Sequence, residues 1–597
     1  MNGTITKENK SVTGLIKSKY TKLFLKKYKA NYLFGILFLV IIDVLQTRVP
    51  IITGYVIDGL ELKNIEMVNI EHQILYLFII ALSVFIGRII WRYFIFGTSR
   101  SIERDIRNDM FEHLEKMSTK YYQEHSAGEI MAHMTNDLEA VRMAFGQGIL
   151  FICDVAALGT ITIFNMVNEI DLVLTIVAVI PLLLIAITTS ILGKELHKRF
   201  SIKQEAFSDL SNFVQENLSG IKVIKSFVQE KKEIEAFEKV NKNNYNKNMK
   251  LMRMYTVMHP YMQFISGLSL AIAIGYGGYI TVYGRISVGD FAAFIQYLGM
   301  LVWPMMAVGM TINIFTMGSA SLERIEKILD EPIDIKDSVD VKNVNDFKGS
   351  IEVRNLSYKY PETNNYVLKD VSFKVEKGQT LGIIGRTGSG KTTLVNLFLR
   401  IFSPDKNSIY ISGEDIMDLP LDVLRKNIGY VPQDNFLFSN TISNNIDFGV
   451  RNSTENEIIN AAKAACVHDN IIDFKEGYKT VIGERGVSLS GGQKQRISIA
   501  RALIKEPEIL ILDDSVSAVD TDTEEKILSH IKNTRSGKTN VIIAHRISTI
   551  QDADLIIVID DGKIIEQGKH AELIQNNGLY NSIYEKQLLE KMLEEQE

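Results

Sequence analysis

Long apolar stretches fill the first half of the chain, and each is long enough to cross a bilayer as a helix. A helix needs about 20 apolar residues to span the hydrocarbon core. Six stretches meet this requirement, at 32–53, 74–96, 146–167, 172–191, 257–282 and 288–309. The pattern therefore predicts six transmembrane helices, with both ends of the chain on one side of the membrane.

The polar segments between the spans predict which side faces the cytoplasm. Lysines precede the first span, and basic residues are frequent in 98–142 and 192–253. Because cytoplasmic loops carry an excess of lysine and arginine, we expect these segments to lie inside. We interpret them as polar helices that continue the spans into the cytoplasm.

Several of the predicted spans contain charged residues, which are costly in hydrocarbon. These residues are Asp43, Arg48, Arg88, Arg92 and Asp154. They indicate either a polar substrate pathway or pairing between helices. An Asp43–Arg88 or an Asp154–Arg88 ion pair would serve the second purpose, and the sequence does not choose between them.

The second half of the chain has a different pattern, in which β-branched strands alternate with helices. The segment LGIIGRTGSGKTTLVNLFLR predicts a strand, a glycine-rich turn and a helix, and it contains the phosphate-loop motif G-x-x-x-x-G-K-[ST]. Backbone N–H groups at such a helix start attract anions. The predicted nucleotide-binding residues here are Gly385, Arg386, Thr387, Gly388, Ser389, Gly390, Lys391, Thr392 and Thr393. Lys391 would hold the β and γ phosphates of a nucleotide, and Thr392 would bind Mg²⁺.

Two aspartates end a second apolar run, ILILDD at 509–514. Four aliphatic residues in succession predict a strand buried on both faces, as at the centre of a parallel sheet. Ligands collect at the carboxyl edge of such sheets. Asp513 is therefore expected to reach Mg²⁺ through water, while Asp514 stands next to it.

Leu489 begins a third motif, LSGGQ, which precedes a predicted helix and supplies a second anion-binding helix start on the same chain. Its predicted nucleotide contacts are Ser490, Gly491, Gly492 and Gln493. With LSGGQ just before the ILILDD strand, the chain resembles ATP-binding cassette (ABC) proteins along essentially its whole length. The implied fold is a polytopic α-helical membrane domain followed by an α/β P-loop ATP-binding cassette, the half-transporter of the type IV exporter fold. We expect a membrane domain at 1–335, a linker at 336–348, a cassette at 349–588 and a polar tail at 589–597.

The resemblance also implies further site residues. Tyr360 would stack on adenine, and Gln433 would contact Mg²⁺ and sense the membrane domain. His545 would contact the γ phosphate, and Asp520 would be the aspartate of the D-loop. Glu484 would meet the partner's coupling helices, whose counterparts in this chain are expected at 119–126 and 211–219.

One copy of each motif predicts a dimer, because the family encloses each ATP between the P-loop of one cassette and the LSGGQ of another. Asp514 occupies the position where the family usually has the glutamate that polarises the attacking water. Aspartate is shorter by about 1.5 Å. A positioned general base contributes about 10²–10⁴-fold, so this site is expected to be slow. The combination of Asp514 with an intact LSGGQ in one chain resembles one subunit of heterodimeric bacterial multidrug exporters.

We therefore expect a subunit of a heterodimeric exporter of amphipathic small molecules, with ATP and Mg²⁺ as cofactors and a second half-transporter as partner. The predicted location is the cytoplasmic membrane, with the ATPase domain in the cytoplasm. A homodimer, a lipid or peptide exporter, and a regulatory ATP-binding subunit are the alternatives. A net charge of −5 gives no indication of nucleic-acid binding. Pockets lined by Phe264, Tyr297 and Trp303 would suit many drugs.

Overall fold

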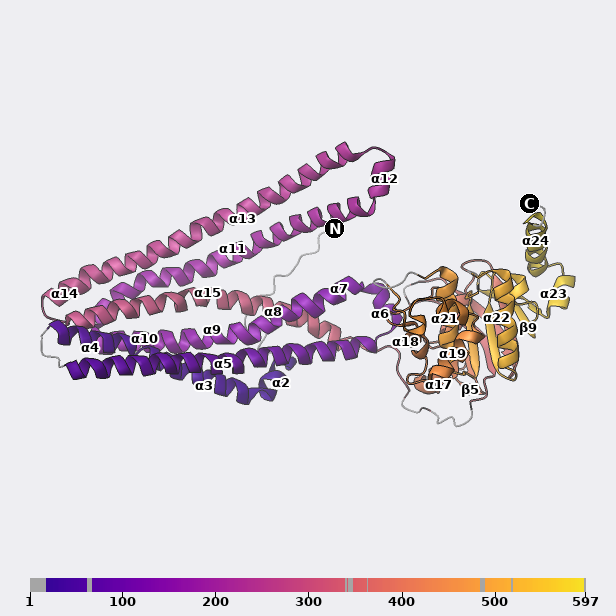
Figure 1. The fold of residues 1–597 in the computed structure, drawn as a ribbon, viewed down its shortest axis with the longest axis horizontal. Helices are drawn as coiled ribbons and strands as arrows, with labels where there is room; N and C mark the ends of the chain where they lie inside the picture. Colours follow the sequence, from indigo (N-terminus) through magenta and orange to yellow (C-terminus); the bar gives the residue numbers. More distant parts are fainter. Residues whose placement is uncertain are drawn as a thin grey trace. The chain divides into compact units, whose positions relative to one another are not determined.

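The computed structural model describes residues 18–61, 67–338, 341, 347–361, 363–483, 489–516 and 519–594. Contacts along the chain divide it into two compact units (Figure 1). The membrane unit contains the residues up to Lys116 together with Glu124–Pro332. The cassette unit contains Met117–Gln123 and the residues from Ile333 onward.

Long helices make up the membrane unit, and six segments of the described chain are long and apolar enough to cross a membrane. These segments are Lys29–Glu61, Asn69–Glu115, Ala127–Ile170, Leu172–Thr189, Glu230–Val282 and Val288–Asp330. Each predicted span overlaps one of them, so the prediction of six spans is confirmed.

The helices of the membrane unit include the six candidate spans and the polar segments 98–142 and 192–253 that continue them. Their bounds are α2 (Lys19–Lys27), α3 (Lys29–Gln46), α4 (Val49–Glu61), α5 (Met67–Glu115), α7 (Ala127–Ala132), η1 (His133–Asp137), α8 (Leu138–Met143), η2 (Ala144–Gly148), α9 (Ile149–Asp154), η3 (Val155–Gly159), α10 (Thr160–Asn165), η4 (Met166–Ile170), α11 (Leu172–Ser219), α12 (Ile221–Ser226), α13 (Glu230–Ile272), η5 (Ala273–Gly277), α14 (Gly278–Val282) and α15 (Val288–Asp330). Helix α11 packs along α13, α3 packs along α5, and α15 lies against α4, α8 and α11.

Two glycines let α4 and α15 approach closely. A Cβ on Gly289 would lie 2.1 Å from the carbonyl oxygen of Gly54, so a larger residue would force the helices apart. Asp58 joins the same helices, because its carboxylate accepts hydrogen bonds from the hydroxyl of Ser287 and the N–H of Gly289, both at 2.6 Å. Small residues at helix contacts are typical of membrane proteins, where close packing replaces the hydrophobic effect as the main attraction.

Arg88 pairs with neither of the carboxylates considered for it. Its guanidinium donates to Gln46 Oε1 at 3.2 Å, and no ion pair joins Arg88 to Asp43 or Asp154 in the part of the chain that the structure describes. Its acceptor is instead the uncharged amide of Gln46 on the neighbouring helix α3.

The three aromatic residues considered for drug pockets have different surroundings. Tyr297 is fully buried, and its hydroxyl donates to the carbonyl oxygen of Thr47 at 2.7 Å. Phe264 is 67% exposed on the isolated chain. Trp303 lines a cavity of the membrane unit.

The two predicted coupling segments have different outcomes. The expected short helix at 119–126 is α6 (Thr119–Glu124). The expectation at 211–219 is wrong, because these residues continue the long helix α11 to Ser219 and the short connecting helix is α12. FVQENLS contains no helix breaker, and the helix ends only at the following Gly220, whose N–H bonds to Glu216 O.

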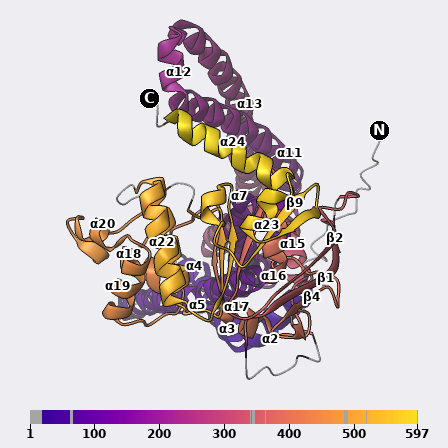
Figure 2. The same ribbon diagram turned by 90° about the vertical axis from the view of Figure 1, so that its right-hand side faces the viewer.

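The cassette unit contains two β-sheets with helices around them (Figure 2). The six-stranded sheet has the order β10-β9-β3-β8-β7-β6, and the four-stranded antiparallel sheet has the order β2-β1-β4-β5. Strands β6, β7, β8, β3 and β9 run parallel, and β10 is antiparallel to β9. The predicted α/β fold class is confirmed.

The strands are β1 (Ile351–Tyr358), β2 (Leu368–Val375), β3 (Thr380–Gly385), β4 (Ile409–Ile411), β5 (Glu414–Asp415), β6 (Ile428–Val431), β7 (Ile509–Asp513), β8 (Thr539–Ile543), β9 (Leu555–Asp560) and β10 (Lys563–Gly568). The helices are α16 (Lys391–Phe398), α17 (Leu421–Asn427), α18 (Ile442–Asp447), α19 (Glu455–Ala464), α20 (His468–Ile472), η6 (Gly477–Lys479), α21 (Gly491–Leu503), α22 (Thr521–Thr534), η7 (Ile547–Thr549), α23 (His570–Gln575) and α24 (Leu579–Glu594). In Figure 2, α18, α19, α20 and α22 lie on one side of the unit and β1, β2 and β4 on the other.

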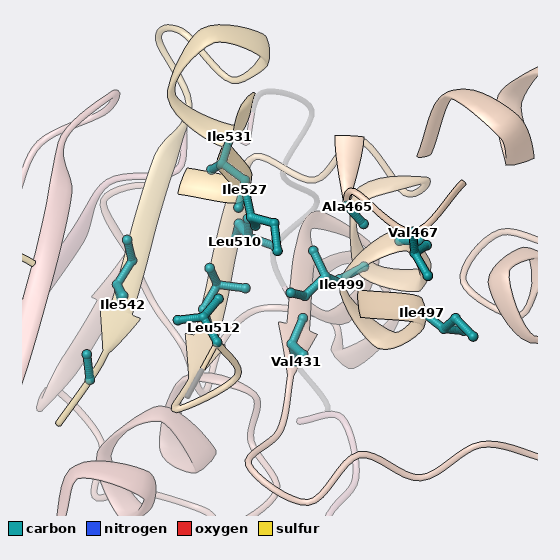
Figure 3. Packing of buried hydrophobic residues seen from close by; sticks show 14 of the residues in the cluster. Val431, Ala465, Val467, Ile497, Ile499, Leu510, Leu512, Ile527, Ile531 and Ile542 are labelled. Carbon is teal, nitrogen blue, oxygen red and sulfur yellow. The ribbon is translucent and has the colours of Figure 1, made fainter. Parts of the chain in front are cut away.

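Strand β7 separates two hydrophobic cores, which explains why its sequence is apolar without alternation. Leu510 and Leu512 pack into the core formed with α21 and α22, as Figure 3 shows. Ile509 and Ile511 point to the opposite face, where α16 and α17 pack. All five residues of β7 are buried, so the strand holds its terminal carboxylate, Asp513, at a fixed place on the edge of the sheet.

We expect Ile511→Ala to destabilise the cassette unit by about 2–5 kcal/mol, because it removes buried methyl and methylene groups and leaves a cavity beneath α16. The measurement is thermal unfolding of the full chain in detergent. The matched control is Ile565→Ala on β10, where the isoleucine is 48% exposed and the change is expected to stay within about 0.5 kcal/mol. Equal losses in the two variants would contradict the two-core description.

Candidate nucleotide site

The loop between β3 and α16 follows a path that its glycines permit. A Cβ on Gly385 would lie 2.0 Å from the carbonyl oxygen of Ile559 in β9, so a larger residue does not fit there. Gly388 and Gly390 have φ values of 80° and 103°, which glycine adopts without strain. The loop ends at the first N–H groups of α16, and such unpaired donors bind anions.

Lys391, the first residue of α16, spans the inside of this loop. Its Nζ donates to the carbonyl oxygens of Gly385 and Arg386, both at 2.8 Å. The side chain is buried, and this burial lowers the pKa of its ammonium group, while Asp513 and Asp514 act in the opposite direction. A cation held by neutral carbonyl groups in a buried place is ready to pair with phosphate oxygens.

The remaining loop residues differ in their exposure to solvent. Arg386 and Thr387 are exposed, with Arg386 Nε 4.0 Å from Asp560 Oδ1. Ser389 is buried, and its hydroxyl has no hydrogen-bond partner among the described residues. An unpaired buried hydroxyl is costly, and a phosphate oxygen would satisfy it.

Asp513 and Thr392 form the pair of oxygen donors that a hard cation requires. Thr392 Oγ1 donates to Asp513 Oδ1 at 3.3 Å. Asp513 is 1% exposed, and its Oδ2 has no hydrogen-bond partner in the described part of the chain. Burial raises the pKa of the Asp513 carboxyl, and the negative charge of Asp514 adds to this effect. These two residues fit Mg²⁺, which is bound through one or two protein oxygens together with substrate phosphates.

No group of three or more His, Cys, Asp and Glu side chains suited to a metal occurs in the described ranges. A magnesium ion at Asp513 and Thr392 would therefore depend on the phosphates of the nucleotide for further ligands. The donor set is that of a site for Mg²⁺ with a nucleotide, and a permanent structural metal does not fit it.

Asp514 lies beside this pair in a left-handed backbone conformation, with φ of 46°. Its N–H donates to the carbonyl oxygen of Ile543 at 3.0 Å, which fixes the turn after β7. Gln433 Nε2 donates to Asp514 Oδ2 across 3.5 Å. The structure thus brings together Asp513, Asp514 and Gln433, as the sequence predicted.

Tyr360 stands at the other end of the cleft. Its ring makes edge contacts with Phe402 and Tyr358, at centroid distances of 5.2 and 5.5 Å, and its hydroxyl lies 3.0 Å from Thr393 Oγ1. Tyr360 and His545 both line a cleft of about 310 Å³ together with the loop residues from Thr387 to Thr393, Gln433, Asp513 and Asp514. The cleft therefore joins an aromatic wall to a phosphate loop.

The LSGGQ residues and Asp520 lie outside this cleft, whose described lining contains none of them. Ser490 caps its own helix α21: its hydroxyl accepts from the N–H of Gln493 at 3.3 Å, and Gln493 Oε1 accepts from the N–H of Ser490 at 3.0 Å. Asp520 likewise caps α22 by accepting from the N–H of Thr523 at 2.9 Å. Glu484 lies outside the described residues.

Sequence reasoning missed two residues that hold the site in place. Gln587 in α24 donates to the carbonyl oxygen of His545 at 2.7 Å and accepts from the N–H of Ile547 at 2.9 Å. Gln495 in α21 donates to the carbonyl oxygen of Asp514 at 3.3 Å. Both glutamines bind main-chain atoms of site residues far away in the chain, and no local pattern marks such contacts.

Six candidate spans followed by a cassette with this cleft are the arrangement of an ABC exporter. A model of the ABC transporter transmembrane region matches residues 32–305, and a model of the ABC transporter family matches residues 368–517.

The sequences and a solved structure of known ABC transporters align with nearly the whole chain. A probable multidrug resistance ABC transporter ATP-binding/permease protein, YheI of Bacillus subtilis, is 40% identical over 569 residues, covering 95% of this chain and 97% of the relative. The multidrug resistance-like ATP-binding protein MdlA of Escherichia coli is 38% identical over 565 residues, covering 95% of each. The solved structure of a bacterial Atm1-family ABC exporter with ATP bound aligns with a TM-score of 0.75 at 27% identity, covering 94% of this chain and 98% of that one.

This chain belongs to the ABC transporter family, with a membrane domain and an ATP-binding domain in one polypeptide. Its cassette is an ATPase coupled to transport across the membrane. The expected resemblance to ABC exporters is confirmed at this level.

We expect Asp513→Asn to stabilise the nucleotide-free protein at pH 7 and to abolish the added stabilisation by Mg²⁺ in the presence of ATP. The folded-state pKa of Asp513 is raised above 3.8, so stability falls as the pH rises from that value through the folded pKa, and the penalty is present at neutral pH. Asparagine removes both the penalty and the charge that attracts Mg²⁺. The measurement is the Tm with ATP, with and without Mg²⁺.

The control for this experiment is Asp552→Asn, which changes an exposed aspartate and should leave both quantities unchanged. A lower Tm of the nucleotide-free Asp513→Asn protein, or an unchanged Mg²⁺ effect, would contradict the assignment.

Proposed function

We propose that this chain is one subunit of a dimeric exporter that uses ATP to move amphipathic small molecules across the cytoplasmic membrane, and that its partner is a different half-transporter. The cassette and both chain ends lie in the cytoplasm in this proposal, as the basic segments between the spans indicate. The multidrug names of YheI and MdlA support this substrate class.

The single observation that carries the dimer is the separation of the two nucleotide-binding motifs. The cleft at Lys391 contains the P-loop, but the LSGGQ residues lie outside it within the same chain. The hydroxyl of Ser490 caps α21, and Ser490 is absent from the described lining of that cleft. A second cassette would close the cleft of this chain with its signature helix and would receive the signature helix of this chain in return.

Each site residue has a role in this proposal. Lys391 and the N–H groups of the loop hold the phosphates, while Thr392, Asp513 and Gln433 bind Mg²⁺ directly or through water. Tyr360 stacks on adenine, and His545 contacts the γ phosphate. On the partner's nucleotide, Ser490 and the following residues of the signature, together with Asp520, complete the site.

Two parts of this proposal, slow hydrolysis at this site and a different half-transporter as partner, are based on Asp514. A glutamate at this position would place its carboxylate about 1.5 Å further toward the γ phosphate. Aspartate is also among the residues that tolerate the left-handed backbone found here. The rest of the site is complete, so this chain retains ATP binding, and its LSGGQ serves a partner that hydrolyses ATP faster. Closure on ATP shifts the membrane domain because the closed state binds nucleotide from both sides and the open state does not.

We expect Asp514→Glu to raise the ATP hydrolysis rate at this site by about 10-fold or more, since a positioned general base contributes about 10²–10⁴-fold. ATP affinity should change little, because the phosphate contacts remain. The measurement is the ATPase rate of the complex in proteoliposomes, with the partner's corresponding site inactivated. Asp514→Asn is the control and should lower the residual rate. An Asp514→Glu protein that hydrolyses ATP no faster would show that the missing methylene is not the cause of slow turnover.

A further inference from the structure

A cavity of about 450 Å³ lies in the membrane unit between α3, α5, α9 and α15. We call it the Asp43 cavity, and the lining residues that matter here are Asp43, Arg88, Trp91, Phe151, Asp154 and Trp303. All six belong to the predicted spans, so the cavity combines charged groups with aromatic walls at a depth where water is scarce.

Asp43 is the unusual member of this group. Its side chain is 3% exposed, and its Oδ2 is buried without a hydrogen-bond partner in the described part of the chain. A buried carboxylate that lacks a donor is costly, and charged residues within membrane spans mark substrate pathways. The unsatisfied oxygen calls for a hydrogen-bond donor that the described chain does not supply.

The other charged groups of the cavity already have partners. Arg88 donates to Gln46, as described above. The guanidinium of Arg92 lies 5.5 Å from the centre of the Trp91 ring, and the carboxylate of Asp154 accepts from the indole of Trp303. The Oδ2 atom of Asp43 therefore suits a positively charged hydrogen-bond donor, although Arg88 and Arg92 also line the cavity.

The walls suit the apolar part of the same ligand. Trp91 is 7% exposed, and Phe151 and Trp303 meet edge to face with their ring centres 5.9 Å apart. Aromatic faces attract organic cations, and the position of Arg92 over Trp91 is an example within this cavity.

We propose that the Asp43 cavity binds the protonated amine of an amphipathic substrate. The N–H of the ammonium group donates to Asp43 Oδ2, and the apolar body lies against Trp91, Phe151 and Trp303. This assignment rests on the proposed export function and specifies its substrate class. A quaternary ammonium compound carries the same charge but no N–H, so the cavity distinguishes it from a protonated amine.

The chain contains only two tryptophans, and both line the Asp43 cavity, so intrinsic fluorescence reports on this place. The experiment titrates the full exporter in lipid nanodiscs with dodecyldimethylamine, dodecyltrimethylammonium and 1-dodecanol. The signal of an exporter in which Trp91 and Trp303 are both replaced by Phe is subtracted to remove the fluorescence of a partner chain. We expect the wild type to bind the amine about tenfold more tightly than the trimethylammonium compound, the size of one charge-assisted hydrogen bond.

Asp43→Asn should remove the preference for the amine and leave the affinity for 1-dodecanol unchanged. Asp209→Asn, which removes an exposed carboxylate from the cytoplasmic part of α11, should retain the preference. Equal binding of the amine and the trimethylammonium compound by the wild type would overturn the proposal and indicate that Asp43 carries a proton. This comparison leaves Asp43 unchanged, so its result tests the proposal even if Asp43→Asn fails to fold. An Asp43→Asn protein that keeps the preference would overturn the proposal as well.

Transport measurements separate this inference from the proposed function. If proteoliposomes export a neutral amphipathic dye with ATP but the wild type shows no preference for the amine, the assignment of the Asp43 cavity alone fails. If the amine preference is present but no amphiphile is exported with ATP, the binding site stands and the proposed export function fails.

Discussion

The enclosure of a triphosphate is the constraint on which the rest of this structure depends. A cleft that is open to water on one side holds the negative charges of a triphosphate less firmly than an enclosed site does. Salt and water screen interactions across an open surface, whereas a closed site strengthens them. The cassette meets half of this requirement with Lys391 and α16. The helix start at Ser490, which we propose supplies the second half to a partner, is absent from the described lining of this cleft.

The need to hold charged groups at the nucleotide site also explains the arrangement around β7. Two hydrophobic cores hold this strand from both faces, so Asp513 is fixed at the sheet edge although its carboxylate is buried and short of hydrogen bonds. Burial raises the pKa of Asp513 and lowers that of Lys391, which means that both groups are held in surroundings that disfavour their charged forms. Mg²⁺ at Asp513 and phosphate at Lys391 would favour the charged forms of both groups. The membrane unit contains a similar feature at Asp43, whose buried Oδ2 lacks a hydrogen-bond donor in the described part of the chain.

Much of the fold was predictable, because the signals are local. The six spans follow from length and hydropathy, and the buried strand at 509–513 follows from four aliphatic residues in succession. The phosphate loop follows from glycine positions that the backbone requires, as the close approach of Gly385 to Ile559 shows. The cleft brings together Tyr360, Gln433, Asp514 and His545. Of these, Tyr360, Gln433 and His545 were predicted to be site residues through the family resemblance.

The predictions that failed, and the contacts that were missed, depend on tertiary structure. The second short cytoplasmic helix was placed at 211–219 by likeness to the family's coupling helices, but α11 continues to Ser219 and Gly220 forms its C-cap. The sequence left two carboxylates open as possible partners of Arg88, and the structure gives it the amide of Gln46. Gln587 binds the backbone of residues about forty positions earlier, and nothing near it in the sequence indicates this contact.

The most direct test of the central claim is cross-linking between the two motifs across a subunit boundary. Thr387 of one cassette and Ser490 of another are replaced by cysteine, in chains whose Cys153 and Cys466 have been changed to serine. If the complex is a heterodimer, one cysteine is placed in this chain and the other at the partner position that aligns with Thr387 or Ser490. The account predicts a disulfide that joins two chains, forms with ATP and is absent without it. A single chain that hydrolyses ATP at the full rate of the complex, without any such cross-link, would contradict it.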